Sequence, residues 1–360
     1  MPKFHELEIN EIIHETEECV SIAFDVPEDL KEKYEFVQGQ YLTLRTEIAG
    51  EDVRRSYSIC SGVDEGTLRV AVKQVPKGLF STFANQELKK GDLLRVMTPM
   101  GRFYTELNPQ NEKHYVGFAA GSGITPILSI IKSVLSREPK STFTLFYSNK
   151  KASTVIFKEE IEDLKDTNLH RLRVFHLLTR EPNEIPLLAG RIDKAKCDSI
   201  HDQLLQDRKI DEVFLCGPIE MVMGVKESMV DKGVPEDNVH FELFTSPLAS
   251  KPLVQEEERT EETQSVAMSE VKIILDDQAM TFDLPYEGTN VLDAALERGA
   301  DLPFACKGGV CCTCRAKLIS GEVEMTVNYS LEPEEVEAGF ILSCQAHPKT
   351  PEVVIDFDQQ

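Results

Sequence analysis

Basic residues are scarce in this 360-residue chain, which has 39 Lys and Arg against 62 Asp and Glu and a formal net charge of −23. Nucleic acid would be repelled by such a protein, so we exclude it as a partner. No apolar run is long enough to span a bilayer, because the longest, residues 116–131, is interrupted by Gly121, Gly123 and Pro126. The amino terminus also lacks the basic and apolar regions of a signal peptide. We therefore expect a cytoplasmic protein with no membrane partner.

The sequence also lacks motifs typical of catalysis by side chains alone. The eight histidines form neither a metal-binding helix motif nor part of a catalytic triad. The hydrophobic content of 41 % is ordinary for a globular protein, and the length allows two or three domains with cores of their own. Chemistry in this chain is therefore expected to depend on bound cofactors.

Cysteine, by contrast, is plentiful, and four of the nine cysteines follow a recognisable spacing. Cys306, Cys311 and Cys314 stand in the pattern C-x4-C-x2-C, and Cys344 lies in a distant segment. This is the ligand spacing of plant-type [2Fe–2S] ferredoxins. Zinc sites usually contain two C-x2-C pairs, and buried free cysteines need no spacing at all. We predict that these four cysteines bind a [2Fe–2S] cluster and that Cys312, which falls outside the spacing, is a spectator.

Hydrophobic patterning divides the chain into three domains. The first hundred residues contain short alternating segments separated by Gly and Pro, which indicates an antiparallel β-barrel or sandwich. From residue 114, buried strands alternate with helices (one of them predicted at 155–166), as in a parallel, doubly wound α/β sheet. A strand–turn–strand pattern, a helix capped by Asn290 and a last strand at 352–357 indicate a small α+β domain. The predicted domains are residues 1–108, 109–246 and 267–360, with an acidic linker at 247–266.

The C-terminal part is the most acidic, with 6 basic and 17 acidic residues from Ser265 onward, a net charge of −11. Two explanations remain open. The acids can serve solubility alone, or they can form a face that steers a redox partner toward the cluster, with Glu334 and Glu335 among its members.

Two turns at the ends of predicted strands are candidates for a nucleotide site. Residues 120–126, Ala-Gly-Ser-Gly-Ile-Thr-Pro, join a strand to a helix, where Gly121 and Gly123 would let a pyrophosphate approach the backbone. Residues 216–218, Cys-Gly-Pro, end another strand of the same sheet, and ligands of such sheets bind beyond the carboxyl ends of strands. Residues 55–58, Arg-Ser-Tyr-Ser, and 77–82, Lys-Gly-Leu-Phe-Ser-Thr, are further candidates for holding a phosphate and a ring system.

Together, the motifs at 55–58, 121–126 and 216–218 resemble the ferredoxin–NADP⁺ reductase superfamily, here followed by a plant-type [2Fe–2S] domain. The resemblance covers nearly the whole chain. It implies a six-stranded antiparallel β-barrel for the flavin, a doubly wound nicotinamide domain and a β-grasp ferredoxin domain. It also implies an NAD(P)H-dependent oxidoreductase that passes electrons through FAD and the cluster to an oxygenase complex or another redox protein. A nicotinamide gives two electrons together and the cluster takes one, so a flavin must stand between them.

Other interpretations of the same layout remain open. The chain can be the reductase of a hybrid-cluster protein, or a free-standing flavoenzyme that reduces a small acceptor. A ferredoxin module fused to a relic barrel is disfavoured by the intact flavin and nicotinamide motifs. No oxygen-activating metal site is visible in the sequence, so we do not expect this chain to be the oxygenase itself.

The resemblance implies roles for individual residues. Tyr57, Cys216 and Glu242 would surround the reacting rings, with Phe244 nearby. Arg55, with the turn at 78–81, favours FAD over FMN. The residues implied in FAD binding are Arg55, Tyr57, Ser58, Gly78, Leu79, Phe80 and Ser81. Those implied in nicotinamide binding are Gly121, Ser122, Gly123, Thr125, Cys216, Gly217 and Pro218.

We expect NADPH as the donor, with NADH as the alternative. An enzyme specific for NADH often places a carboxylate at the adenine ribose, whereas residues 148–151, Ser-Asn-Lys-Lys, contain no acid. Thr179 and Arg180 resemble the Ser-Arg pair that holds the 2′-phosphate in the superfamily. Glu181 follows at once, so a solvated ion pair is the alternative role of Arg180.

Overall fold

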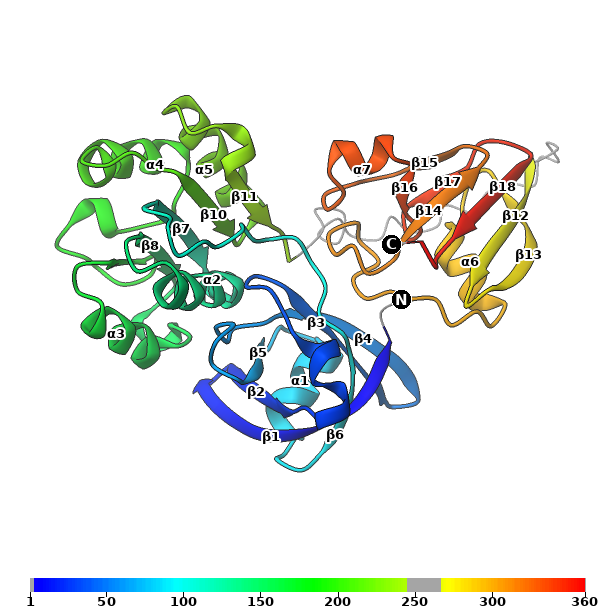
Figure 1. Cartoon of the computed structure of the whole chain (residues 1–360), viewed down its shortest axis with the longest axis horizontal. Coiled ribbons are helices and arrows are strands. Elements are labelled where there is room, and N and C mark those ends of the chain that lie inside the picture. Colours follow the sequence, from blue (N-terminus) through cyan, green and yellow to red (C-terminus); the bar gives the residue numbers. More distant parts are fainter. Residues whose placement is uncertain (1–2, 245–266, 360) are drawn as a thin grey trace. The chain divides into compact units, whose positions relative to one another are not determined.

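The computed structural model describes residues 3–244 and 267–359, which form two compact units (Figure 1). The first unit spans Phe4–Phe244, and the second contains the residues from 267 onward. The predicted linker, residues 247–266, lies outside the described residues. The predicted domain boundaries therefore stay predictions.

An antiparallel barrel begins the first unit. Its six strands have the order β4-β3-β6-β1-β2-β5, and a bridge between Ile59 and Val70 brings the two ends of the sheet together. In β1, Leu7 and Ile9 are buried while Glu6 is exposed, the period-two pattern of a half-buried strand. The strands are β1 (Phe4–Thr16), β2 (Cys19–Asp25), β3 (Tyr41–Ile48), β4 (Glu51–Ser58), β5 (Leu68–Lys73) and β6 (Leu93–Met97), and α1 (Leu79–Gln86) packs against β4 and β5.

A five-stranded parallel sheet follows, with the order β11-β10-β7-β8-β9. The chain runs outward from β7 to β9 and then returns to the other side of β7, so the topological switch point lies between β7 and β10. Helix α2 packs against β7, β8 and β10, whereas α4 and α5 pack together (Figure 1). The elements are β7 (His114–Ala120), α2 (Ile124–Arg137), β8 (Thr142–Asn149), α3 (Lys158–Thr167), β9 (Leu172–Leu178), α4 (Lys194–Ile200), β10 (Glu212–Cys216), α5 (Ile219–Asp231) and β11 (Val239–Glu242).

The start of α3 differs from the sequence prediction. A helix is predicted from residue 155, but α3 begins at Lys158, after Phe157 has adopted a left-handed conformation with φ 59°. Val155, Ile156 and Phe157 are all buried in the core beneath α2 and the sheet. The left-handed backbone of Phe157 cannot belong to an α-helix, so α3 begins only after this residue.

Buried charges join the barrel to the parallel sheet. Lys132 on α2, with a side chain only 4 % exposed, forms ion pairs with Glu65 of the barrel, at 3.1 Å, and with Glu160 of α3. Arg69 of β5 reaches the same Glu160 at 2.7 Å. Because loss of one partner would leave a buried charge unpaired, this network makes the barrel and the sheet one unit.

The second unit is a β-grasp fold, as predicted. Its main sheet has the order β13-β12-β18-β14-β16, and β15 pairs with β17. Asn290 caps helix α6, accepting a hydrogen bond of 2.8 Å from the N–H of Asp293. The elements are β12 (Met268–Leu275), β13 (Gln278–Pro285), α6 (Val291–Glu297), β14 (Arg315–Ser320), β15 (Val323–Met325), α7 (Pro333–Glu337), β16 (Phe340–Leu342), β17 (Ala346–Pro348) and β18 (Glu352–Asp356).

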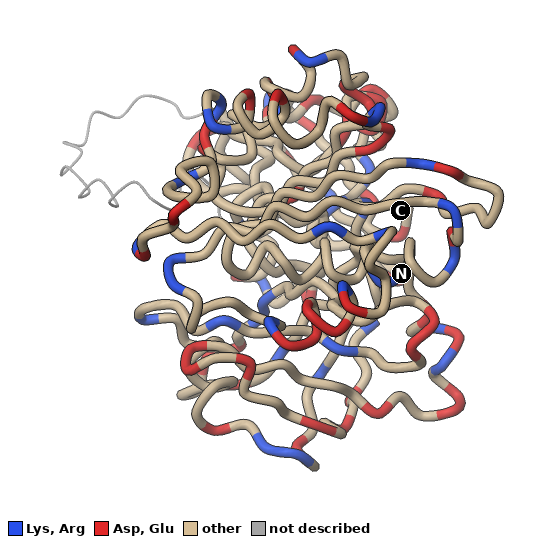
Figure 2. The backbone as a smooth tube through the Cα atoms, turned by 90° about the vertical axis from the view of Figure 1, so that its left-hand side faces the viewer, with Lys and Arg blue, Asp and Glu red and all other residues tan. Residues whose placement is uncertain are grey.

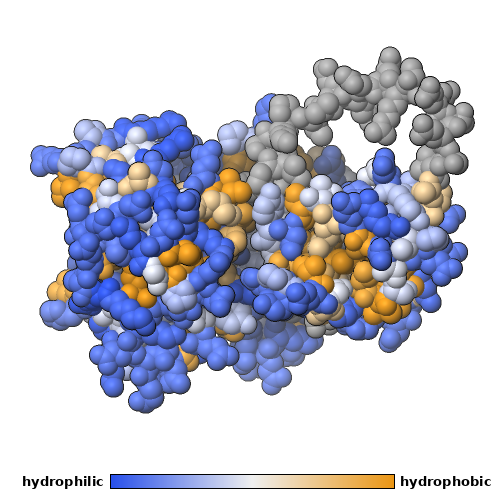
Figure 3. Space-filling model, turned by 90° about the horizontal axis from the view of Figure 1, so that it is seen from above, coloured by the Kyte–Doolittle hydropathy of each residue, from blue (hydrophilic) through white to orange (hydrophobic). Residues whose placement is uncertain are grey.

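Lys and Arg residues are interspersed with the more numerous Asp and Glu residues along the backbone (Figure 2). Apolar side chains reach the surface in small patches on each unit (Figure 3), and in the second unit they include Met268, Ile319 and Val336. Among the described ranges, 3–244 and 267–359, there is no helix with the length and apolar character needed to cross a membrane.

Candidate functional site

Two loops meet at the switch point of the parallel sheet. Strands β7 and β10 are paired with Ala119 opposite Cys216, so the turns that follow them lie side by side. Gly121 has φ 56°, and a Cβ at Gly123 would stand 2.1 Å from the carbonyl oxygen of Cys216. Only glycine allows that approach. The structure thus brings together the two turns in which the sequence predicts a nicotinamide site.

The turn after β7 leads directly into α2. The hydroxyl of Thr125, 2 % exposed, donates a 3.0 Å hydrogen bond to the carbonyl of Ser122 and so braces the turn from within. Helix α2 is fourteen residues long, and its first N–H groups face the switch point with the positive end of the helix dipole. This arrangement suits an anionic pyrophosphate.

A lysine that the sequence analysis missed lies at the same turn. Lys73 ends β5 in the barrel, yet its Nζ lies 3.6 Å from the position a Cβ would take at Gly121. The available signal was a single lysine at the end of a strand whose other residues are mostly apolar, Leu68–Lys73. A cation over a glycine turn adds a second attraction for a phosphate group.

Three further side chains from β4, β10 and β11 meet at this edge. The Ser58 hydroxyl donates a 3.0 Å hydrogen bond to Oε2 of Glu242, across 184 positions of sequence. Glu242 is also paired in register with Cys216, which is fully buried. The structure therefore brings Ser58, implied in FAD binding, together with Cys216 and Glu242, which the family resemblance implies near the reacting rings.

Desolvation is the main cause of the shifted pKa values of Glu242 and Cys216. It raises the pKa of Glu242 to about 7, although the hydrogen bond from Ser58 acts in the opposite direction. Burial likewise raises the pKa of the Cys216 thiol well above its usual range, and the nearby Glu242 adds to the rise. Cys216 is accordingly a neutral thiol, whereas Glu242 gains or loses its proton near neutral pH.

The candidate flavin residues lie on β4 and α1. The ring of Tyr57 packs on Phe80 of α1, with centroids 5.4 Å apart and planes tilted by 35°. Arg55 is exposed, and its Nη1 donates to the carbonyl of Arg54 at 2.7 Å. In the turn before α1, a Cβ at Gly78 would stand 2.4 Å from Oγ of Ser81, so any larger residue there would displace the Ser81 side chain.

These groups fit a flavin dinucleotide in kind. An exposed guanidinium and a glycine turn at the start of a helix suit the pyrophosphate, and an aromatic ring on the same strand suits the flavin ring. Leu79 at the first turn of α1 is 46 % exposed, whereas Phe80 is buried in the barrel core. Phe80 thus supports Tyr57 from behind.

The four cysteines of the ferredoxin-like spacing form two pairs. The thiols of Cys306 and Cys311 are hydrogen-bonded to each other, as are those of Cys314 and Cys344. The hydrogen bond from Cys311, with backbone N–H groups that include that of Gly308, lowers the pKa of Cys306 to about 6. The Gly308 N–H lies 3.3 Å from Sγ of Cys306. Two pairs of thiols with backbone donors fit a cluster of two irons.

No group of three or more His, Cys, Asp or Glu side chains suited to one metal ion occurs among residues 3–244 and 267–359. A [2Fe–2S] cluster needs only two thiols for each iron. The two cysteine pairs are therefore compatible with the absence of a group of three or more ligands around one ion. Cys312 points elsewhere, since its thiol donates a 3.0 Å hydrogen bond to the carbonyl of Ser330. Its spectator role stays a prediction.

The candidate 2′-phosphate residues lie at the carboxyl edge of β8 and β9. The backbone N–H of Thr179 bonds to the carbonyl of Asn149, and that of Arg180 to the carbonyl of Lys150, both at 2.9 Å. Arg180 and Lys150 are exposed. The carboxylate of Glu181 accepts a hydrogen bond of 3.1 Å from the N–H of Ala152. Glu181 therefore has a structural partner other than Arg180.

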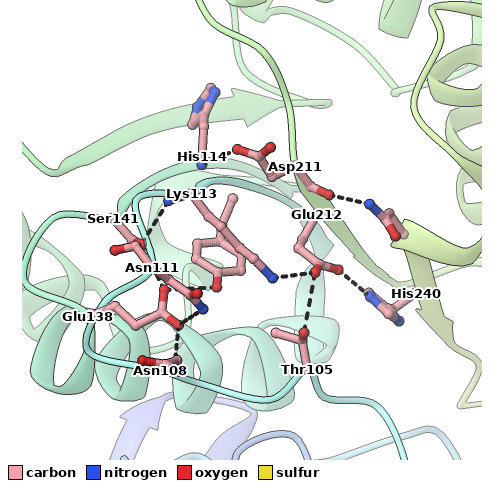
Figure 4. A network of polar contacts seen from close by, with 12 residues as sticks. Thr105, Asn108, Asn111, Lys113, His114, Glu138, Ser141, Asp211, Glu212 and His240 are labelled. Carbon is pink, nitrogen blue, oxygen red and sulfur yellow. Dashed lines mark hydrogen bonds and ion pairs between the residues drawn. The ribbon is translucent and has the colours of Figure 1, made fainter.

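The opposite edge of the sheet holds a different set of polar residues (Figure 4). Glu138 is fully buried there, and Glu212 forms an ion pair with Lys113 at 2.9 Å and a hydrogen bond with His240 at 2.7 Å. The groups that donate hydrogen bonds to Glu138 are the Asn108 backbone, the Asn111 amide and the hydroxyls of Tyr115 and Ser141. These bonds fix the connection between barrel and sheet at the amino ends of the strands, away from the switch point.

Comparison with known proteins matches three consecutive segments of the chain to family models. Residues 6–104 match the "Oxidoreductase FAD-binding domain", residues 118–227 the "Oxidoreductase NAD-binding domain" and residues 273–349 the "2Fe-2S iron-sulfur cluster binding domain". These matches confirm FAD, a [2Fe–2S] cluster and a nicotinamide nucleotide as cofactors, and the choice of NADPH stays a prediction.

Two relatives match the chain over nearly its whole length. The chain is 41 % identical to one component of the 1,2-phenylacetyl-CoA epoxidase of Escherichia coli K12, over 99 % of both chains. It is 32 % identical to the ferredoxin reductase component of 3-ketosteroid-9-alpha-monooxygenase of Rhodococcus rhodochrous, over 98 % of this chain and 96 % of that protein. The structure of phthalate dioxygenase reductase is similar with a TM-score of 0.58 and 22 % identity, over 98 % of each chain, which supports the three-domain fold.

Proposed function

Because the chain belongs to the ferredoxin–NADP⁺ reductase superfamily, in the branch with a C-terminal [2Fe–2S] domain, we propose that it is the reductase component of an oxygenase that acts on phenylacetyl-CoA. The chain is an NAD(P)H-dependent oxidoreductase. When bound, FAD accepts two electrons as hydride and releases them singly to the [2Fe–2S] cluster. The observation that carries the proposal is the 41 % identity to the epoxidase component over 99 % of both chains, which leaves no domain unmatched.

Residues of β4 and α1 hold the flavin in this proposal. Tyr57, supported by Phe80, lies against the flavin ring. Arg55 and the turn at 78–81 bind the pyrophosphate, and the exposure of Arg55 leaves its guanidinium available for that role. Gly78 stands at the N-cap of α1 and has no side chain to keep a ligand away from the backbone of this turn.

The nicotinamide nucleotide binds at the switch point. Gly121, Ser122 and Gly123 receive the pyrophosphate, with Lys73 as its cation. Thr125 holds the turn in shape, and Gly217 and Pro218 shape the wall beside Cys216.

At the reacting rings, the chain's own residues exclude water and hold a proton. Cys216 is a neutral, fully buried thiol beneath the turns that receive the nicotinamide nucleotide. Glu242 holds a proton up to near neutral pH, and Ser58 fixes its carboxyl by a hydrogen bond. Tyr57 closes the flavin side. These residues orient the reactants for hydride transfer, in which proximity makes the main contribution to rate.

NADPH is the proposed donor. Arg180, with Thr179 beside it, and Lys150 offer charge and hydrogen bonds at the edge where the adenine ribose of a doubly wound domain lies. The hydrogen bond from Ala152 to Glu181 supports a free role for Arg180, because the neighbouring acid is engaged elsewhere.

Cys306, Cys311, Cys314 and Cys344 would hold the cluster, which would supply single electrons to the partner oxygenase. Acidic side chains near the cluster steer that partner, but the set differs from the sequence expectation. Glu335 is buried and forms an ion pair of 3.2 Å with Arg315, so it supports the fold. Glu334 is exposed on α7, next to Val336, which is 40 % exposed. A basic partner surface with an apolar centre fits this helix.

Other acceptors remain as alternatives. The 32 % identity to a steroid monooxygenase reductase over 98 % of this chain favours an oxygenase over a small acceptor, but it leaves the downstream substrate open. Reductases of hybrid-cluster proteins have a similar layout. The cytoplasmic location remains a prediction.

The test is reconstitution. The purified protein, NADPH and the oxygenase components of a phenylacetyl-CoA epoxidase are mixed with phenylacetyl-CoA, and the epoxide is measured. We expect product only when all are present, and a markedly lower rate with a steroid 9α-oxygenase as acceptor. Rapid reduction of a dye without any reduction of the epoxidase would overturn the proposed partner while leaving the reductase activity intact.

A further inference from the structure

Gln345 occupies a position beside the fourth cysteine that no part of the proposed function uses. Its Nε2 lies 3.5 Å from Sγ of Cys344 and 3.1 Å from the carbonyl oxygen of Lys307, and both contacts are hydrogen bonds. The side-chain amide of glutamine carries two protons on one nitrogen, so it can make both bonds at once. One amide therefore touches both segments that supply the cluster ligands.

We propose that Gln345 sets the reduction potential of the cluster by donating a hydrogen bond to the sulfur of Cys344. The proposal rests on the ligand set Cys306, Cys311, Cys314 and Cys344 proposed above. Gln345 is a positioning residue, since it acts through a ligand and does not bind iron.

The backbone delivers the amide to this place with little freedom. The Gln345 N–H bonds to the carbonyl of Leu342 at 2.9 Å, and its carbonyl accepts from the N–H of Thr326 at 3.0 Å. Gln345 is 7 % exposed. Its Cγ lies 3.4 Å from where a Cβ at Gly309 would stand, so the side chain lies against the loop that carries the first three cluster cysteines. A fixed, buried donor costs little entropy when its hydrogen bond forms.

The electronic effect follows from charge. Reduction adds one negative charge to the cluster, part of which falls on the ligand sulfurs. A hydrogen bond to a sulfur stabilises the more negative state more strongly, so it raises the potential. Because the site is largely shielded from water, the interaction is stronger than it would be in solvent. Removal of the donor should therefore make the cluster harder to reduce.

The second bond has a separate consequence. Lys307 has φ 50°, a conformation that non-glycine residues rarely adopt, and its carbonyl is held by Gln345. The amide thus ties the ligand loop to the distant segment of Cys344. Loss of this tie should speed release of iron, but that effect alone would also follow from a purely structural role.

The experiment measures the potential. The midpoint potential of the cluster is determined by spectroelectrochemical titration in the full-length wild type, in Gln345→Leu and in Gln345→Glu, with Gln278→Leu as the control at an exposed glutamine of the same unit. We expect a shift to more negative potential in Gln345→Leu and a larger one in Gln345→Glu, which adds a charge. The flavin potential and that of Gln278→Leu should not change. An unchanged cluster potential in Gln345→Leu overturns the proposal.

A second measurement tests the proposal even if the Gln345 variants fail to hold iron. Wild-type protein labelled with ¹⁵N in glutamine side chains is reduced, and pulsed electron paramagnetic resonance is used to detect coupling between the cluster and a glutamine amide nitrogen. We expect a weak coupling in the wild type and in Gln278→Leu. Its absence in the wild type removes the hydrogen bond and the proposal with it. Loss of iron in Cys344→Ser with an intact Gln345 would test the ligand set separately.

Discussion

The two cofactor sites of this protein are assembled in opposite ways. Three of the four cluster cysteines lie within residues 306–314, on one loop of a small unit. The nucleotide site instead collects side chains from β4, β5, β7, β10 and β11, including Ser58 and Glu242, which lie 184 positions apart. A site built from one loop is visible in the spacing of its residues. A site built from five strands becomes visible only after the strands are placed.

Substitution of the cluster cysteines separates the two sites most sharply. Cys306→Ser, Cys311→Ser, Cys314→Ser and Cys344→Ser should each lose the cluster, because in each variant one iron loses one of its two thiolates. Iron content and visible absorption report the loss. Reduction of a dye at the flavin by NADPH should persist in all four variants.

Cys312→Ser is the matched control, since the Cys312 thiol bonds to Ser330 and lies next to a ligand. It should keep the iron. Iron lost in Cys312→Ser but retained in Cys311→Ser would reverse the ligand assignment.

Glu242→Gln should impair the nucleotide site without touching the cluster. Loss of the titrating carboxyl beside the reacting rings should slow hydride transfer by about a hundredfold, measured by stopped-flow reduction of the flavin. In the wild type, the rate of flavin reduction should change near pH 7, because desolvation raises the pKa of Glu242 to about 7. This pH dependence should be absent in Glu242→Gln, which has no carboxyl to titrate.

The same substitution has a predictable effect on stability. The folded pKa of Glu242 lies above its usual value of 4.5, so its contribution to stability is fully present below pH 4.5 and lost as the pH rises through 7. Above pH 7 the loss is roughly 3 kcal/mol. Glu242→Gln should therefore melt at a higher temperature than the wild type at pH 8 and at a similar temperature at pH 4.5. Equal melting temperatures at pH 8 would contradict the raised pKa.

Lys73→Met tests whether a barrel residue serves the sheet's nucleotide site. The pyrophosphate is common to NADH and NADPH, so KM should rise for both, by about tenfold to a hundredfold for a charge-assisted hydrogen bond. Lys90→Met, at an exposed lysine of the same barrel, is the control. An increase for one nucleotide alone would place Lys73 away from the pyrophosphate.

Arg180→Ala should have a smaller and selective effect. It should reduce kcat/KM for NADPH by about tenfold, because an exposed charge contributes less than a buried one, and leave NADH unchanged. Arg191→Ala, at another exposed arginine of the domain, is the control. An unchanged ratio of the two efficiencies would remove Arg180 from the site.

Glu334→Gln should produce the smallest change. A single surface charge steers association weakly, so reduction of the partner should slow about twofold at low salt and not at all at high salt. Glu335→Gln should instead lower the melting temperature of the second unit, because Arg315 would lose its buried partner. If neither salt nor the Glu334→Gln substitution changes the rate of partner reduction, the acidic excess serves solubility alone.

Local signals predict much of this molecule. Asn290 caps α6 because an amide oxygen can accept from the first turn, and the turn after β7 needs glycine because Cys216 is adjacent. Tertiary burial decides the rest. Helix α3 begins only after the left-handed Phe157, and Glu335 is buried in an ion pair with Arg315. The side chain of Lys73 extends from the barrel to the glycine turn of the parallel sheet. No period or spacing in the sequence marks these three residues, since their partners come from other elements.

The hydrogen bond between Ser58 and Glu242 ties the last strand of the first unit back to the barrel with which the unit begins. Everything that the nicotinamide site uses consequently lies within Phe4–Phe244. A gene divided after the codon for Phe244 would therefore still encode the complete nicotinamide site. Recombination downstream of Phe244 can exchange the [2Fe–2S] unit for another one while the flavin and nicotinamide sites stay intact, so a new partner can be acquired without loss of the nicotinamide site.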